Sequence, residues 1–234
     1  MSLADDLLLA NGVRLPAVGL GTGCVSLASF AHIPQPPTKA SVAVRRLSLQ
    51  GAKAISVLST AIRLGYRHID TAQLYGNEPA VGKAIAASGL PRSAFVISSK
   101  HYGGCSMGKP GTLPLALNAS LQRLGVQYLD IYLLHLPGIL DKDRRKCSSA
   151  LPNGPSMRAA LWAEMTIALQ SGLARAIGVA NFAWRHLQPL VDSPVPPMVL
   201  QTEYSLLHHD EELRMDGVQQ TVRQMGSYAH REHS

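Results

Sequence analysis

The sequence predicts an α/β fold of the TIM-type (β/α)8 barrel class, because short apolar runs alternate with helical patterns along most of the chain. Strands separated by helices require a parallel sheet with right-handed crossovers. The uninterrupted apolar run "IYLLH" is typical of a strand that is covered on both faces. A doubly wound dinucleotide fold needs G-x-G-x-x-G at the opening of a helix. "GLGTGC" at 19–24 lacks the third glycine and opens no helical pattern, so the barrel is favoured.

The expected elements follow an N-terminal hairpin, which Asn11–Gly12 between two apolar runs predicts. Strands are expected at 16–22, 65–72, 94–100, 128–135, 174–181 and 197–204. Helices are expected at 53–64, 78–88, 113–124, 157–171, 184–192 and about 210–225.

The predicted barrel is incomplete. Insertions are expected near 24–52 and 138–156, on the face of a parallel barrel that carries the active site. A full barrel takes about 250 residues, and the divergent tail near 226–234 contains no pattern for the last two β/α units. We therefore expect a single domain over 1–234, with about six β/α units and two open sheet edges, that derives from a shortened product.

Composition and charge limit the classes of function. The hydrophobic share of 46% is enough for a sizeable core. The net charge of +7 is spread without a long basic run or interleaved aromatics, which disfavours nucleic-acid binding and suits attraction to cofactor phosphates. Cys24, Cys105 and Cys147 lack disulfide or metal-site spacing. The N-terminus resembles neither a signal peptide nor a membrane span, so we expect a cytoplasmic protein.

Complementary ionisable side chains stand at the ends of three successive predicted strands. Asp70 ends the second strand, Lys100 the third and His135 the fourth, while Tyr75 follows the second. Taken singly, each suits a helix cap or a wall of the fold. Because the carboxyl ends of barrel strands meet at one mouth, we expect the four side chains to converge there, which favours a catalytic interpretation.

The chemistry of this set is that of proton transfer to a carbonyl. A tyrosine hydroxyl has an unperturbed pKa near ~10 and is a poor proton donor at neutral pH. A lysine ammonium beside it favours the phenolate and so lowers that pKa. A carboxylate paired with the lysine keeps the ammonium charged and oriented, and a histidine can donate a hydrogen bond to the carbonyl oxygen.

The motif "GYRHIDTAQLYGNEPAVG" at 65–82 resembles the first signature of the aldo-keto reductase family throughout. "ISSK" at 97–100 and "LLHLP" at 133–137 look like the lysine and histidine segments of that family. "WAEM", "AIGVANF" and "VLQTEY" continue the match in order, so the resemblance covers about residues 7–204. It implies that Tyr75 is the general acid, that Lys100 and Asp70 tune it, and that His135 orients the carbonyl.

The resemblance also implies a cofactor and a reaction. Asn181 and Gln201 match positions that hold the nicotinamide carboxamide, and Thr22 and Asp70 match residues near the nicotinamide ribose. The implied reaction is hydride transfer from NADPH to a small-molecule aldehyde or ketone. No nucleic-acid, membrane or metal partner is expected.

The sequence also departs from the family pattern. Gly23 and Leu136 stand where family members often carry tryptophan, and Ala180 replaces the usual serine before Asn181. The last two units usually supply a tyrosine that stacks on the nicotinamide and the basic residues that hold the 2′-phosphate. An alternative hypothesis is therefore an impaired fragment with an interaction role, whose open barrel edges are covered by a partner protein.

Two other polar groups favour structural interpretations. Glu78 stands near the start of a predicted helix, where a negative side chain suits the helix dipole. His208 and His209 are adjacent instead of one helical turn apart, so a solvated turn is favoured over a metal site.

Overall fold

The computed structural model describes most of the predicted barrel. The described residues are 6–9, 11–23, 49–102, 111–138 and 154–202, with the backbone of 228–230. The three cysteines, most of both predicted insertions, the helix predicted at about 210–225 and the pair His208–His209 lie outside these residues.

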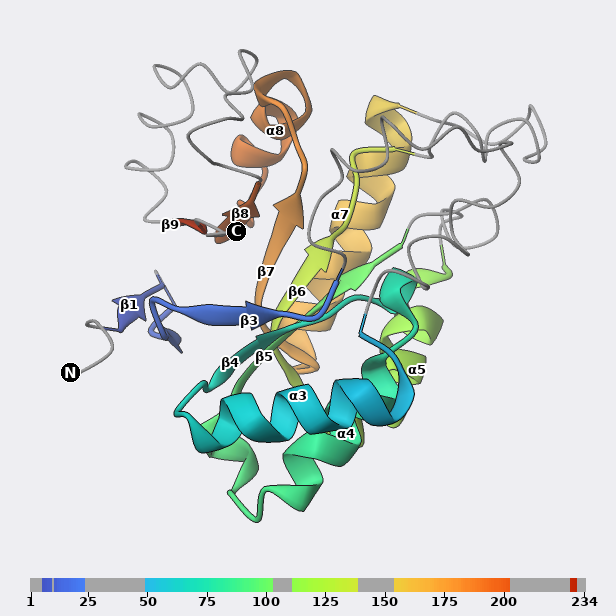
Figure 1. The fold of residues 1–234 in the computed structure, drawn as a ribbon. Helices are drawn as coiled ribbons and strands as arrows, with labels where there is room; N and C mark the ends of the chain where they lie inside the picture. Colours follow the sequence, from blue (N-terminus) through green and yellow to red (C-terminus); the bar gives the residue numbers. More distant parts are fainter. Residues whose placement is uncertain are drawn as a thin grey trace, which may run out of the picture.

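A curved parallel sheet forms the centre of the fold, with the strand order β3-β4-β5-β6-β7-β8-β9 (Figure 1). Its strands are β3 (Gly19–Gly21), β4 (His68–Asp70), β5 (Val96–His101), β6 (Leu129–Leu134), β7 (Ala174–Ala180), β8 (Val199–Gln201) and β9 (Tyr228–His230). The six predicted strands are confirmed, and β9 is a short seventh strand that the sequence analysis did not predict. Within the described residues β3 and β9 do not pair with each other, so the sheet is an open part of a barrel, as expected.

Helices cover the outer face of this sheet (Figure 1). They are α3 (Gly51–Arg63), α4 (Glu78–Ala87), α5 (Leu113–Leu124), α7 (Pro155–Gln170) and α8 (Trp184–Val191), with short 3₁₀ turns η1 (Gln73–Tyr75) and η2 (Arg92–Ala94). α4, α5 and α7 each carry a proline in the first turn, where the missing N–H has no intrahelical partner to lose. No helix in the described part of the chain has both the length and the apolar character of a membrane span.

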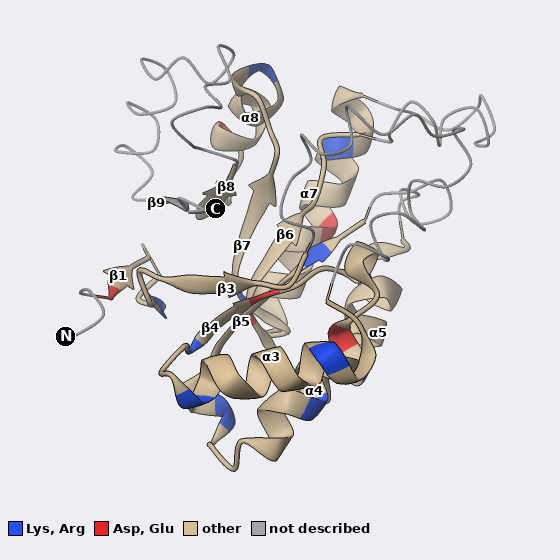
Figure 2. Cartoon of the chain, viewed as in Figure 1, with Lys and Arg blue, Asp and Glu red and all other residues tan. Residues whose placement is uncertain are grey.

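Charged residues are spread over several helices and strands in the described part of the chain, without gathering on one element (Figure 2). This agrees with the dispersed basic residues of the sequence. The single-domain organisation over 1–234 stays a prediction.

Two apolar clusters lie on opposite faces of the sheet. The outer one packs the strands against the helices. The inner one contains Ile131, Leu133 and Val199 from the strands together with Leu9 and Leu15 from the hairpin. Successive side chains of a strand point to opposite faces, so every second residue joins the inner face.

The predicted hairpin is present, with β1 (Leu7–Leu8) antiparallel to β2 (Arg14–Leu15). The Asn11 side-chain amide donates a hydrogen bond to the backbone carbonyl of Arg175, near the start of β7. The hairpin therefore covers the amino end of the strands and leaves their carboxyl ends for the site described below.

A buried ionic cluster fixes the outer side of β5. The Glu78 carboxylate is fully buried and accepts hydrogen bonds from Ser99 Oγ at 2.8 Å and Ser120 Oγ at 3.3 Å. Arg123 Nε donates to the same carboxylate at 2.7 Å. Glu78 thus joins α4 to β5 and α5, beyond the helix-dipole role expected from the sequence.

We predict that Arg123→Met lowers the free energy of unfolding by about 3 kcal/mol, because it leaves the Glu78 carboxylate buried without its cation. Methionine keeps the apolar stem, so the loss reports mainly on the charge. Lys83→Met, at an exposed position of α4, is the matched control and changes stability by about 0.5 kcal/mol or less. Urea unfolding of both variants measures the difference, and equal losses would show that the ion pair does not stabilise the fold.

Candidate active site

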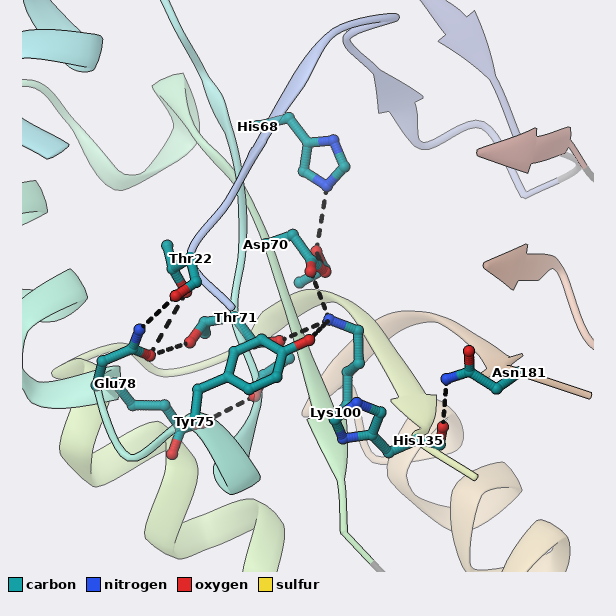
Figure 3. Close-up of polar contacts among 12 residues, drawn as sticks. Thr22, His68, Asp70, Thr71, Tyr75, Glu78, Lys100, His135 and Asn181 are labelled. Carbon is teal, nitrogen blue, oxygen red and sulfur yellow. Dashed lines mark hydrogen bonds and ion pairs between the residues drawn. The ribbon is translucent and has the colours of Figure 1, made fainter. Parts of the chain in front are cut away.

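Lys100 lies at the centre of a polar group at the carboxyl ends of β4 and β5 (Figure 3). Its side chain is 1% exposed, and its ammonium donates hydrogen bonds to Asp70 Oδ2 and, at 3.1 Å, to the backbone carbonyl of Thr71. The Lys100 Nζ atom lies 3.4 Å from the hydroxyl oxygen of Tyr75. The ammonium therefore contacts a carboxylate and a phenol at once, as the sequence predicts.

Asp70 is ionised in this arrangement. The residue is 5% exposed, and Oδ1 accepts a hydrogen bond from Ser98 Oγ at 2.7 Å. Burial by itself raises the pKa of Asp70, but the Lys100 charge and the hydrogen bonds from Lys100 and Ser98 outweigh it, so the pKa lies below its ordinary value. The charged form of Asp70 is thus favoured although the residue is buried.

The ring of Tyr75 is held on two sides. Tyr75 ends the short turn η1, and Gln50 Nε2 donates to its backbone carbonyl at 2.8 Å. The ring centroid lies 5.0 Å from Lys100 Nζ. A Cβ atom at Gly23 would lie 2.7 Å from Tyr75 Cζ. The Tyr75 ring therefore packs against the backbone of Gly23, in the space that a side chain at position 23 would need.

His135 follows β6 and presents a neutral ring to the site. Its centroid lies 5.6 Å from that of Tyr75, with the planes at 83°. Burial, followed by the positive charge of Lys100, lowers the pKa of His135 to about 3. Its Nδ1 atom is buried without a hydrogen-bond partner among the described residues. A neutral imidazole has one N–H, which can be donated to a carbonyl oxygen.

Asn181 contacts both His135 and Gln201. Asn181 adopts a left-handed backbone conformation, with φ of 60°, and its Nδ2 donates to the backbone carbonyl of His135 at 3.0 Å. Its backbone N–H donates to the carbonyl of Gln201 at 2.9 Å. The structure therefore brings two side-chain amides and the imidazole to the carboxyl ends of β6, β7 and β8.

Thr22 lies in a different environment. It is fully buried, its hydroxyl donates to Asn77 Oδ1 at 3.4 Å, and its backbone N–H donates to the Asp70 carbonyl at 2.9 Å. Asn77 also accepts from Thr71 Oγ1 at 2.8 Å and donates to the Thr22 carbonyl at 2.9 Å. Thr22 and Asn77 thus tie β3 to the segment after β4, and the Thr22 hydroxyl is engaged within the protein.

Ser98, Asn77 and Gln50 hold the site in place and were not predicted from the sequence. Ser98 precedes Lys100 by two positions, so strand alternation places both side chains on the inner face. That signal was available in the sequence. Asn77 and Gln50 act across long sequence separations, for which the local pattern gives no indication.

The chain belongs to the aldo/keto reductase family, whose family model matches residues 41–224. It is 35% identical to a glyoxal reductase of Bacillus subtilis over 91% of this chain and 63% of that protein. It is 32% identical to an NADPH-dependent codeinone reductase of Papaver somniferum over 89% of this chain and 60% of that protein.

Solved structures show the same fold. The structure of a Bombyx mori aldo-keto reductase in complex with NADP matches 98% of this chain and 66% of that one, with 28% identity and a TM-score of 0.70. An aldo-keto reductase complexed with NADPH matches 97% of this chain and 61% of that one, with a TM-score of 0.71. The chain thus spans about 60% of the length of the curated relatives named above.

We predict that acid destabilises the fold through His135. A histidine with a lower pKa in the folded chain binds fewer protons there than in the unfolded chain. The free energy of unfolding therefore decreases as the pH is lowered from 6.5 to about 3. Between pH 7 and pH 5, His135 lowers the free energy of unfolding by about 2 kcal/mol. Asp70, with a pKa below 3.8, loses its contribution only at lower pH.

The measurement is urea unfolding at pH 7 and pH 5 for the unchanged chain and for His135→Asn. The variant is expected to lose less stability on acidification, because asparagine does not titrate. His186→Asn, in a partly exposed position of α8, is the control for a general effect of removing a histidine. The same loss in all three proteins would contradict a neutral, buried His135.

Proposed function

We propose that this chain reduces small aldehydes or ketones with NADPH, and that Tyr75 is the general acid. The contact of one buried ammonium with both the Asp70 carboxylate and the Tyr75 hydroxyl is the observation that supports it most strongly. The membership in the aldo/keto reductase family supports the same reaction class.

The proton-transfer roles follow from the contacts. An ammonium beside a phenol oxygen favours the phenolate, so Lys100 makes Tyr75 a stronger acid toward a carbonyl oxygen. Asp70 keeps that ammonium charged and directed at the phenol, while the neutral imidazole of His135 orients the carbonyl with its N–H. These donors are fixed before a substrate arrives, which is the arrangement that stabilises developing charge most effectively.

The residues present fit a nicotinamide cofactor. Asn181 and Gln201 follow neighbouring strands and are joined by a backbone hydrogen bond, and a carboxamide both donates and accepts hydrogen bonds with amide side chains. We propose that these two residues hold the carboxamide. When bound, NADPH supplies the hydride. Relatives complexed with NADP and NADPH support this cofactor, whereas the ribose contacts of Thr22 and Asp70 stay predictions.

We expect Tyr75→Phe to lower kcat by about 10²- to 10⁴-fold, the range for loss of a general acid. The assay follows oxidation of NADPH by the full chain with 4-nitrobenzaldehyde. Binding of NADPH, measured by fluorescence titration, is expected to stay within about twofold, because Tyr75 is assigned to the proton and not to cofactor binding. Equal turnover by both proteins would remove Tyr75 from the mechanism.

Gly23→Ala tests the position of the phenol. The new Cβ would lie 2.7 Å from Tyr75 Cζ, so the ring has to shift from its place in this chain. We expect kcat to fall about 10- to 100-fold because small displacements of reacting groups are costly. Gly21→Ala is the matched control, since a Cβ there meets no atom within 4 Å. If the two alanine variants lose activity equally, the close approach at Gly23 does not position Tyr75.

The alternative of an impaired fragment with a partner protein at the sheet edges stays a prediction, as do the cytoplasmic location and the absence of a nucleic-acid partner. The same assay separates the alternative from the enzyme. Turnover that is absent from the unchanged chain at saturating NADPH would favour the interaction role.

A further inference from the structure

His68 and Ser98 continue the site into the interior of the sheet. Asp70 and Ser98 are paired in the parallel register of β4 and β5, so their side chains share the inner face. His68 is two positions before Asp70 in β4 and points the same way. His68 Nε2 lies 3.1 Å from Ser98 Oγ, and both residues are almost fully buried. Figure 3 shows His68, Asp70, Lys100 and Tyr75 in succession.

The direction of these hydrogen bonds follows from counting protons. A serine hydroxyl has one proton, and Ser98 donates it to the Asp70 carboxylate, which as an anion can only accept. Ser98 must therefore accept from its other neighbour. His68 Nε2 carries a proton in consequence, and the order of donation is His68 to Ser98 to Asp70.

The fold leaves room for the imidazole at this place. A Cβ atom at Gly19 of β3 would lie 2.6 Å from His68 Nδ1. Only a residue without a side chain allows the ring to lie between β3 and Ser98. His68 is thus packed between β3 and Ser98 of β5.

We propose that Ser98 and His68 are positioning residues of the reaction, which orient the Asp70 carboxylate so that it holds the Lys100 ammonium against Tyr75. This inference rests on the proposed function for its catalytic consequence, and on the structure alone for the chain of hydrogen bonds. It extends the site from the phenol through Lys100, Asp70 and Ser98 to His68.

Each Asp70 oxygen has a separate role in this arrangement. Oδ2 accepts from Lys100 and Oδ1 accepts from Ser98, so the plane of the carboxylate is fixed from both ends. Without the Ser98 hydroxyl, Oδ1 is buried without a donor, which is costly for a charged group. The carboxylate is then free to turn, its hold on the ammonium weakens, and the phenol becomes a poorer acid.

The ionisable groups around Asp70 are few among the described residues. Lys100 from β5 contacts it directly, and His68 acts on it from its own strand. Tyr75 lies on the other side of the ammonium, and His135 lies at the end of β6. A change in the pH profile of kcat on substitution of Ser98 therefore reflects an altered pKa of one of these groups.

The first test is independent of activity. Nitrogen-15 NMR of histidine in the full chain at neutral pH reports which ring nitrogen of His68 carries the proton. We expect a protonated Nε2, whose signal changes in Ser98→Ala and stays unchanged in Ser99→Ala. The control replaces the adjacent serine, which lies on the outer face and bonds to Glu78. A bare Nε2 on His68 would overturn the proposal.

The second test is the pH profile of kcat with NADPH and 4-nitrobenzaldehyde. For Ser98→Ala we expect kcat at pH 7 to fall about tenfold, because the phenol is less acidic. The pH above which kcat declines is expected to rise by about 1 unit for the same reason. Ser98→Thr keeps the hydroxyl and restores both quantities, whereas Ser99→Ala changes kcat by about twofold or less and leaves this pH unchanged. A uniform fall in kcat with no change in this pH would overturn the positioning role.

Failure of the proposed function gives a different result. If the unchanged chain and Tyr75→Phe turn over equally, Tyr75 is not the general acid and the catalytic part of this inference falls with it. The NMR result still decides whether His68, Ser98 and Asp70 form the chain of hydrogen bonds.

Discussion

The buried ion pair between Lys100 and Asp70 is the constraint on which the site depends. Two charges with almost no exposure are stable only where geometry and additional hydrogen bonds compensate the loss of water. Here the Asp70 carboxylate accepts a hydrogen bond from the Ser98 hydroxyl, and the Lys100 ammonium also donates to the backbone carbonyl of Thr71. The arrangement thereby fixes a positive charge 3.4 Å from a phenol that is partly exposed. A group that would be costly in an ordinary core thus stands beside the phenol to which we assign the proton transfer.

Strand alternation places two polar clusters back to back on β5. Ser98 and Lys100 face the inner side and join Asp70, whereas Ser99 between them faces outward and bonds to the buried Glu78. The outer cluster is anchored by Arg123 of α5. The strand that carries Lys100 is thus held from the helix layer as well as from the inside. The amino-terminal hairpin lies at the opposite end of the strands, so stability and chemistry occupy different ends of the sheet, as in other parallel barrels.

Much of this organisation could be predicted from the sequence, because apolar runs, prolines and glycines mark the ends of strands and helices locally. The convergence of Asp70, Tyr75, Lys100 and His135 followed from their places at strand ends. What the sequence could not give depends on contacts between distant segments. The fit of Gly19 against His68 and of Gly23 against Tyr75, the engagement of Thr22 by Asn77, and the pairing of β9 with β8 require the folded neighbours.

The most direct test of the account is the titration of the Asp70 carboxyl, followed by carbon-13 NMR in the full chain and in Lys100→Met. In the unchanged chain the pKa of Asp70 is expected to lie below 3.8, because the Lys100 charge and the hydrogen bonds outweigh burial. When the ammonium is removed, the effect of burial is no longer offset by the Lys100 charge. The pKa of Asp70 is therefore expected to rise well above 3.8. An Asp70 that titrates identically in the two proteins would show that no such ion pair organises the site.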